Sequence, residues 1–464
     1  GGGHDRVMRN SEAEFVLVTN IDIEFTDQAI HTLVAAAGED SNCEIASWEA
    51  RQAPYEHPKY YDPVTLEVNW SSHACVLIRR SAYLSCGGYE PKIFMYGEDV
   101  ELSYRFRSYG YRLRYCPSAL VHHYTYESEA QVKPLQYRGS TLANLYIRWR
   151  YGNITDRVAG VLLQGWLLFS PSAYTNARRH LISNACTFVK NIVHFSKGKG
   201  PRGEEGYPFR AFDYEMTRGG AFWPVGKSLS ALPKVTVVTR TYRKREKFLR
   251  QSIISVINQT YPNIELIIVE DGGKTTQPLV AEFLTMPNVN IRYYGLEKVG
   301  RSVTGNHGLE MATGEYCMFL DDDDLLFSDH VEVLVSSMLD NPQAAAAYSQ
   351  SIEIATNVDD QGYYDEVSHV EPETFKHSFD YNILLDHNFI PIQSLLFKRS
   401  LFLNRGGFET DMDHLEDWNL WLRYGFNNTF SYVAKTTSLF RTPADFSTRK
   451  DRHMQLHNAY FIAK

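Results

Sequence analysis

The sequence predicts an α/β fold present in two copies, each a mostly parallel, Rossmann-like sheet with flanking helices, joined by a helical segment. Three observations lead to this prediction. Blocks from the first part of the chain recur in order in the second part, short apolar runs alternate with helical patterns in that second part, and the segment between them has helical periodicity. Alternating strands and helices are typical of parallel sheets covered by helices on both faces.

The internal repeat consists of three ordered blocks. Residues 14–22 recur at 315–323, residues 79–90 recur at 398–409, and residues 98–105 recur at 416–423. The offset is nearly the same for all three pairs, and the order is kept. We conclude that one fold occurs twice in the chain.

The second copy shows the front end of the fold in full. The pattern predicts a buried strand at 235–239, a helix at 247–259 and a second strand at 265–269 that runs into Glu270-Asp271-Gly272-Gly273. Ligands of such sheets bind beyond the carboxyl ends of the strands. This acidic turn is therefore a candidate ligand-binding segment.

The first copy has no counterpart of these two front strands, because its first repeat block already begins at residue 14. A parallel sheet without them would expose a long edge and half of its core. We expect that the sequence starts within the first domain. The alternative is a degenerate first domain that the rest of the chain covers.

The expected domain organisation has three parts. Residues 1–134 form the C-terminal part of the first domain, residues 135–232 form a helical extension and linker, and residues 233–464 form the complete second domain. Helical patterns and a Gly- and Lys-rich break at 197–201 support the middle segment.

The composition is that of a globular protein, with 44% hydrophobic and 22% charged residues in a chain of 464. The longest apolar stretch, 158–169, is shorter than the roughly 20 residues that span a bilayer. Six cysteines without C-x-x-C spacing indicate a reduced, cytoplasmic compartment. These features exclude disordered, fibrous and disulfide-framework proteins.

The net charge of −8 conceals a basic segment. Residues 138–202 contain ten Lys or Arg and one acid, Asp156. Such a segment could contact anionic lipid at the inner face of the cell membrane, and the alternative is an ordinary packing face. Because it contains no recognised nucleic-acid-binding module, we expect no nucleic-acid partner.

Two groups of acids are candidates for catalysis. Asp321 to Asp324 follow a predicted strand at 316–320, and carboxylates in this position suit Mg²⁺ or Mn²⁺. Glu416-Asp417 begins a helical pattern, and a carboxylate there could act as a general base. The alternatives are a solvated acidic loop for the first group and an acidic helix N-terminus for the second.

The second copy resembles family 2 glycosyltransferases of the GT-A fold. The resemblance covers about 234–445 and depends on the order and spacing of seven motifs. These are 235–243, Asn258-Gln259-Thr260-Tyr261-Pro262, Val269-Glu270-Asp271-Gly272, Gly305-Asn306-x-Gly308, Gly314-Glu315-Tyr316, Asp321-x-Asp323-Asp324 and Glu416-Asp417-Trp418.

The resemblance implies a role for each matching residue. The nucleotide-binding residues would be Thr239, Thr241, Glu270, Asp271, Arg301, Asn306, Asp321 and Asp322. Asp323, with Asp321, would bind the divalent metal ion. Asp417 would be the catalytic base, with Glu416 beside it. The family usually has two Asp where this chain has Glu270-Asp271.

The first copy resembles the rhamnosyl- and galactofuranosyltransferase-like members of the family. The motifs are residues 19–25, which include Asp22, and residues 75–80, 94–99 and 119–123. The resemblance implies that Asp22 and His123 bind metal and that Asp99, with Glu98, is the base. At the same distance after Asp417 lies Arg441, which could contact a phosphate instead. Without its front strands, this copy is not expected to bind a donor.

The implied function is metal-dependent, inverting transfer of a sugar from a UDP- or dTDP-sugar to a glycan or lipid-linked glycan. The expected setting is the synthesis of a surface polysaccharide such as O-antigen, in the cytoplasm or peripherally at the inner face of the membrane. One alternative is a scaffold of inactive transferase folds. Another is a nucleotidyltransferase, against which Glu416-Asp417-Trp418 and Gly406-Gly407-Phe408-Glu409 argue.

Overall fold

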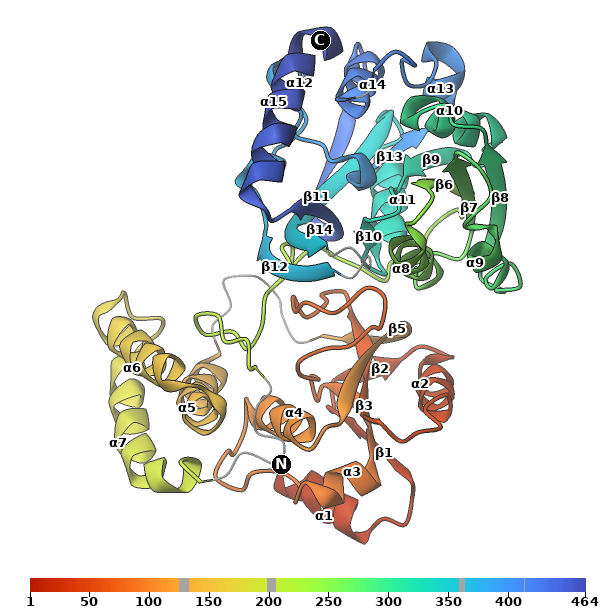
Figure 1. The fold of residues 1–464 in the computed structure, drawn as a ribbon. Coiled ribbons are helices and arrows are strands. Elements are labelled where there is room, and N and C mark those ends of the chain that lie inside the picture. Colours follow the sequence, from red (N-terminus) through yellow and green to blue (C-terminus); the bar gives the residue numbers. More distant parts are fainter. Residues whose placement is uncertain (125–132, 198–205, 359–363, 413) are drawn as a thin grey trace. The chain divides into compact units, whose positions relative to one another are not determined.

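The computed structural model describes residues 1–124, 133–197, 206–358, 364–412 and 414–464 (Figure 1). The chain divides into two compact units, Gly1–Gly226 (unit 1) and Lys227–Lys464 (unit 2). Each unit has its own sheet and its own hydrophobic core. Of the predicted Gly- and Lys-rich break, residues 198–201 lie outside the described residues.

Unit 1 begins with a five-stranded sheet and its helices. The elements are α1 (Gly2–Asn10), β1 (Phe15–Thr19), β2 (Ile23–Phe25), α2 (Ala29–Gly38), β3 (Ile45–Ala53), β4 (Cys75–Arg79), α3 (Arg80–Ser85), α4 (Glu98–Ser108) and β5 (Arg112–His123). The strand order is β1-β4-β3-β5-β2. Every residue of β3 and β4 is buried, so the middle of the sheet is covered on both faces.

Three helices complete unit 1, namely α5 (Pro134–Tyr151), α6 (Ile154–Phe169) and α7 (Ala177–Phe195). Both α6 and α7 pack against α5, which in turn packs on α4. The segment 206–226, for which the sequence predicts a linker, returns to this core instead. Its aromatic rings Tyr207, Phe209 and Tyr214 pack there because they bury apolar surface, and Tyr104 donates a hydrogen bond to the Tyr214 carbonyl (2.6 Å).

Unit 2 contains a nine-stranded sheet. Its strands are β6 (Val235–Tyr242), β7 (Ile264–Asp271), β8 (Val289–Leu296), β9 (Tyr316–Phe319), β10 (Leu325–Leu326), β11 (Ala346–Val358), β12 (Tyr364–Val370), β13 (Leu395–Lys398) and β14 (Phe430–Pro443). Its helices are α8 (Glu246–Ile257), α9 (Gln277–Ala281), α10 (Arg301–Met311), α11 (His330–Asp340), α12 (Tyr381–Asp386), α13 (Arg399–Arg405), α14 (Glu416–Gly425) and α15 (Phe446–Ala463).

The sheet of unit 2 has the order β10-β14-β11-β13-β9-β6-β7-β8, with β12 paired to β11. The front strands β9, β6, β7 and β8 are parallel, as the strand–helix–strand pattern predicts. The rest of the sheet is mixed, because β13, β10 and β12 run antiparallel to their neighbours. The α/β class is confirmed, and parallel pairing is concentrated in the front half of this sheet.

The sequence repeat corresponds to a shared half-sheet. Strands β1-β4-β3-β5-β2 of unit 1 and β9-β13-β11-β14-β10 of unit 2 have the same order and the same relative directions. The register agrees as well, since Phe15 faces Arg79 in one unit and Tyr316 faces Lys398 in the other. Residues that recur in the sequence therefore occupy equivalent places in the two sheets.

Two glycines let helix α10 pack closely against strand β6 and against Phe408. A Cβ on Gly308 would lie 2.3 Å from Cγ1 of Val238 on β6, and a Cβ on Gly305 would lie 2.6 Å from the Phe408 ring. Both distances are far below van der Waals contact. The Gly305-Asn306-x-Gly308 motif is thus explained by packing.

We expect the Gly308→Ala substitution to destabilise unit 2 by about 1–3 kcal/mol, because the added methyl group forces β6 and α10 apart. Denaturant unfolding measures this change. Gly38→Ala is the control, since a Cβ there meets no atom within 4 Å. Equal stability of the two variants would contradict the packing explanation.

Candidate functional site

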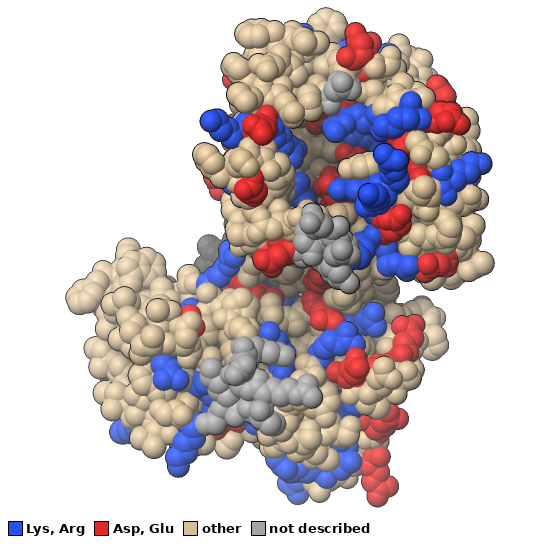
Figure 2. All heavy atoms as spheres, viewed as in Figure 1, with Lys and Arg blue, Asp and Glu red and all other residues tan. Residues whose placement is uncertain are grey.

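The candidate site of unit 2 lies at the carboxyl ends of neighbouring parallel strands. Arg240 and Thr241 end β6, Asp271 ends β7, and the run Asp321–Asp324 follows β9. Helix α14 adds Glu416 and Asp417 at its N-terminus. Figure 2 shows a recess on the viewed face of unit 2, with acidic and basic side chains along it. The structure therefore gathers most of the predicted residues at one sheet edge.

Arg240 joins the two predicted groups of acids. Its Nε and one terminal nitrogen each lie 2.7 Å from an oxygen of Asp321, and its other terminal nitrogen lies 3.1 Å from Glu416. The guanidinium is buried and lies 5.2 Å from the centroid of the Phe408 ring. Burial opposes its charge, but Asp321 and Glu416 outweigh that effect and hold the pKa of Arg240 above its usual range.

A second arginine, Arg245, pairs with the middle of the acid run. It lies 2.7 Å from Asp322 and 2.6 Å from Asp323, while Thr241 donates a hydrogen bond to Asp322 (2.7 Å). Burial and the adjacent charge of Asp323 raise the pKa of Asp322 to about 7. This half of the acid run thus carries more negative charge than one arginine neutralises.

The Glu416-Asp417 pair begins α14 directly after a residue in the left-handed region, Leu415 (φ +59°). Arg301 lies 3.6 Å from Glu416, and Asn388 donates a hydrogen bond to Asp417 (3.0 Å). Burial, and then the charge of Glu416, raise the pKa of Asp417 to about 6. A carboxylate with this pKa is well matched to accept a proton near neutral pH.

Glu270 is saturated by hydrogen bonds within the protein. Its two oxygens accept from the backbone and hydroxyl groups of Thr275 and Thr276 (2.6–2.8 Å) and from the Tyr293 hydroxyl (2.6 Å). Burial works against ionisation, but these donors lower the pKa of Glu270 to about 2. A carboxylate that already accepts five donors has no lone pair left for a nucleotide, so this geometry does not favour the predicted nucleotide contact of Glu270.

Asp271 anchors the loop that precedes α10. It accepts backbone hydrogen bonds from Val299 (2.7 Å) and Gly300 (3.1 Å) and pairs with Lys298. Although burial opposes ionisation, these contacts hold its pKa below the usual range. Because the Lys298 side chain is largely exposed, this end of the carboxylate borders solvent.

The two remaining nucleotide candidates differ in their surroundings. Asn306 exchanges two hydrogen bonds with the backbone of Phe408 (2.9 and 2.7 Å), so it fixes the Gly-Gly-Phe-Glu turn. Thr239 is buried, and its hydroxyl has no hydrogen-bond partner within the described ranges. A buried hydroxyl without a partner is costly, which makes Thr239 the better candidate for contact with a ligand.

The acid run fits a metal ion that is shared with a phosphate ligand. Asp321 is held by Arg240 through both oxygens, and so it does not offer the second carboxylate that the sequence predicts. The side chain of Asp323 is 35% exposed to solvent. Over the residues that the structure describes, no three His, Cys, Asp or Glu side chains form a metal site. Mg²⁺ usually takes one or two carboxylates and completes its shell with water and substrate phosphates, and Asp323 fits that role.

In unit 1 the predicted metal pair comes together. Nε2 of His123 lies 3.4 Å from Asp22, and Nδ1 of the same ring lies 2.7 Å from Oε1 of Gln52. Burial raises the pKa values of Asp99 and Glu98, the latter to about 7 with help from the Asp99 charge. The structure brings Asp22 and His123 into contact and makes Glu98-Asp99 a partly buried acidic pair.

Strand pairing corrects the comparison of His123 with Arg441. Glu24 faces His122 in unit 1, whereas its repeat Leu325 faces Leu439 in unit 2, so the counterpart of His123 is Phe440. The stretch from the start of the helix to this strand position runs from 98 to 122 in unit 1 and from 416 to 439 in unit 2, so it is one residue shorter in unit 2, which shifts the register. Arg441 still reaches the acid run, because its guanidinium donates to the carbonyl of Asp323 (2.7 Å).

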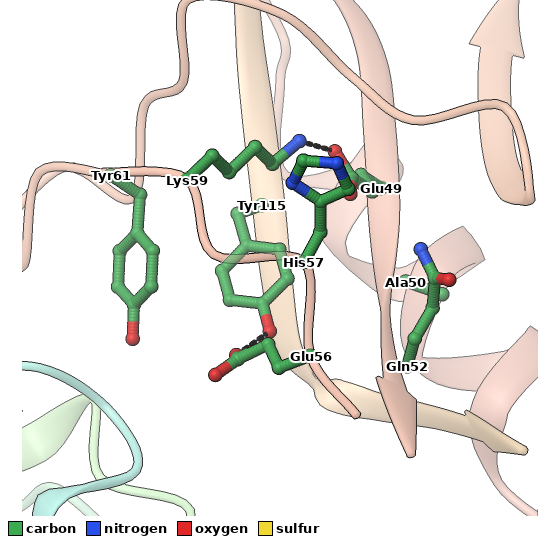
Figure 3. Close-up of a pocket in the computed structure, with 8 residues that line it drawn as sticks. All are labelled: Glu49, Ala50, Gln52, Glu56, His57, Lys59, Tyr61 and Tyr115. Carbon is green, nitrogen blue, oxygen red and sulfur yellow. Dashed lines mark hydrogen bonds and ion pairs between the residues drawn. The ribbon is translucent and has the colours of Figure 1, made fainter. Parts of the chain in front are cut away.

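Unit 1 also contains a buried pocket that the motifs do not indicate. Figure 3 shows Lys59 directed at Glu49 and Tyr115 directed at Glu56. Lys59 also donates to the Trp70 carbonyl (2.7 Å), and Glu49 accepts from the Ser72 backbone (2.9 Å). These contacts satisfy the ion pair internally, and its residues lie outside the repeat blocks, so no spacing signal marks them.

The site of unit 2 also contains three residues that the sequence did not single out as site residues. They are Arg240, Arg245 and Asn388. Arg240 lies within a recognised motif, and its position at the end of a buried strand was a usable signal. Asn388 belongs to a segment without such a pattern, and only the fold brings it to Asp417.

We expect Arg240→Ala to destabilise unit 2 by about 3–5 kcal/mol, because it leaves Glu416 and Asp321 without their shared partner. Arg240→Lys should fall between this variant and the wild type, since one ammonium group cannot span both acids. Arg250→Ala is the control, because its ion pair with Glu282 is exposed. Denaturant unfolding ranks the three, and an undiminished stability of Arg240→Ala would refute the bridging role.

Comparison with known proteins finds similarity in unit 2. Residues 236–402 match Glycosyl transferase family 2. Glycosyltransferase GlyA of Streptococcus pneumoniae is 34% identical over 107 residues, which is 23% of this chain and 15% of that protein. An uncharacterized glycosyltransferase of Rickettsia typhi, RT0329, is 27% identical over 201 residues, which is 41% of this chain and 58% of that one.

Among solved structures, the mannosyltransferase PcManGT from Pyrobaculum calidifontis, in complex with GDP-Man and Mn²⁺, is similar with a TM-score of 0.37. It is 19% identical, and the alignment covers 51% of this chain and 66% of that one. The chain spans less than two thirds of the length of each of these proteins. Residues 236–402 of unit 2 thus match the family 2 glycosyltransferases, and unit 2 has a GT-A-like α/β fold.

Proposed function

We propose that unit 2 is a metal-dependent, inverting glycosyltransferase that moves a sugar from a UDP- or dTDP-sugar to a glycan or lipid-linked glycan. The expected process is surface polysaccharide synthesis at the cytoplasmic face of the membrane. One observation carries the proposal. A single buried guanidinium, that of Arg240, contacts both Asp321 after β9 and Glu416 beside Asp417, so the donor-side acids and the base share one site.

In the proposed reaction Asp417 removes the proton of the acceptor hydroxyl. The freed oxygen attacks the anomeric carbon, and the bond to the nucleoside diphosphate breaks on the opposite side, which inverts the configuration. The hydrogen bond from Asn388 and the N-terminus of α14 orient Asp417 for this role. Its pKa of about 6 keeps it ionised at neutral pH.

The donor is proposed to lie along the ends of β6, β7 and β9. The buried hydroxyl of Thr239 and the Asp271–Lys298 pair would contact the nucleoside, and Arg301 would contact the diphosphate. Asp323 would hold Mn²⁺ or Mg²⁺, which neutralises the diphosphate when bound. We assign Glu270 and Asn306 to holding these loops, because the protein already uses their side chains.

We further propose that unit 1 is the later part of a second domain of the same type, rhamnosyl- or galactofuranosyltransferase-like. The shared half-sheet and the contact between Asp22 and His123 support this proposal. Asp22 and His123 would bind the metal ion, and Asp99 would be the base. Neutral imidazole is the form that binds metal, and burial lowers the pKa of His123, which favours that form.

The first test is binding and slow hydrolysis of a panel of nucleotide sugars with Mn²⁺. We expect Asp323→Ala to abolish both, because the metal carboxylate is lost. Asp417→Asn should keep donor binding and lower transfer to an acceptor by roughly 10²–10⁴. Calorimetry measures binding, and released nucleoside diphosphate measures turnover.

Asp340→Ala is the matched control, because Asp340 is exposed and pairs only with Lys227 among the ion pairs seen. Loss of binding in this control would indicate a general folding defect. If the wild type binds no nucleotide sugar with or without metal, unit 2 is not a transferase, and a scaffold of inactive folds becomes the better interpretation.

The pKa of Asp417 predicts the acid limb of the pH profile. The base must be ionised, so kcat/KM should fall about tenfold for each pH unit below about 6. The hydrogen bond from Asn388 favours the ionised form, and Asn388→Ala should therefore move this limb to higher pH. A limb that stays in place would exclude Asp417 as the titrating base.

A further inference from the structure

Helix α6 exposes an apolar face that no described residue of unit 1 covers. Of its sixteen residues only Gly160 is buried, and this glycine is where the helix meets Arg148 of α5. The exposed apolar side chains recur every three or four residues along one face. They are Ile154 (71% exposed), Val158, Val161, Leu162 (67%), Trp166 (63%) and Phe169 (90%).

Helix α7 repeats this arrangement. It buries Leu181 and Phe188 in the core of unit 1, but exposes Ile182, Val189 and Val193 on its other side. Since α6 and α7 also contact each other, the two exposed faces belong to one helical hairpin. In Figure 2 most of the surface over this hairpin is neither acidic nor basic. We call Ile154–Phe169 and Ala177–Phe195 together the α6–α7 face.

The helices are well formed without a partner for this face. Asn153 and Asp156 make a reciprocal capping box at the N-terminus of α6, with hydrogen bonds of 2.9 and 3.0 Å. The single acid of the basic segment is thus used locally. Exposed apolar patches of this kind on a folded unit mark an interaction site.

The charge around the α6–α7 face indicates which kind of partner it binds. Arg178, Arg179, Lys190 and Lys197 are exposed on or beside α7, whereas Arg148 of the same basic segment is buried. A second copy of the chain would bring the same cations against one another in a symmetric contact. An anionic lipid surface instead offers negative phosphates to the cations and a hydrocarbon boundary to Trp166, Phe169 and Leu162.

We propose that the α6–α7 face binds an anionic membrane surface, lying in the plane of the headgroups with its apolar side chains inserted. A helix of sixteen residues is about 24 Å long, so α6 suits the interface and not a membrane span. In the part of the chain that the structure describes, no helix has the length and apolarity to cross a bilayer. The contact would keep a lipid-linked acceptor near the protein, but it does not depend on the proposed transferase activity.

The test is flotation of the full chain with vesicles of phosphatidylcholine, with and without phosphatidylglycerol, in the absence of any donor. We expect binding only to the anionic vesicles. The triple variant Leu162→Gln, Trp166→Gln, Phe169→Gln should bind at least about tenfold more weakly, because its inserted groups are polar. Arg178→Gln with Arg179→Gln should weaken binding and reduce its dependence on salt.

The matched control replaces three exposed apolar residues elsewhere, Val34→Gln, Leu403→Gln and Phe461→Gln, and it should bind as the wild type does. Circular dichroism and thermal unfolding check that all variants fold. The proposal is overturned if the wild type does not bind anionic vesicles, or if the triple variant binds them equally well. It is also overturned if light scattering finds a vesicle-free dimer that the triple variant dissociates, since the face would then join two copies.

Discussion

The site of unit 2 depends on the guanidinium group of Arg240. Asp321 follows β9 and Glu416 begins α14, and without a cation between them a partly buried and a buried carboxylate would face each other. A buried charge is tolerated only when it is paired and hydrogen-bonded. Arg240 meets this requirement for both acids at once, and Phe408 covers its face. The same contact fixes the distance between the acid run after β9 and the Glu416-Asp417 pair.

Carboxylates in unit 2 differ in pKa and exposure because their surroundings differ. Glu270 receives five donors and has a depressed pKa, so it holds a turn. Asp417 receives one side-chain hydrogen bond, lies beside Glu416 and has a raised pKa, so it can exchange a proton near neutrality. Asp323 shares one arginine with Asp322 and remains partly exposed, which suits a shared metal ligand. Hydrogen-bond supply and burial, more than residue type, separate these roles.

The two units share a geometry beyond their strands. In both, the acidic pair that begins the helix follows a residue with positive φ, Gly97 in unit 1 and Leu415 in unit 2. For Leu415 this conformation is strained, and strain of this kind is often kept where it orients functional groups. The units differ around it, because unit 1 adds the helices α5 to α7, and α6 turns an uncovered apolar face to solvent.

The sequence by itself determined the repeat, the parallel front strands and the segments in which the acids lie, because these follow from local periodicity, turn residues and ordered motifs. It did not determine which arginine each of these acids contacts or how far each acid is buried. The contacts of Arg240 join residues 81 and 176 positions apart, and no local pattern encodes such partners. Counting along the chain equated Arg441 with His123, but strand pairing places Phe440 at the position of His123. Tertiary structure decided these points, since burial and pairing arise only when distant strands meet.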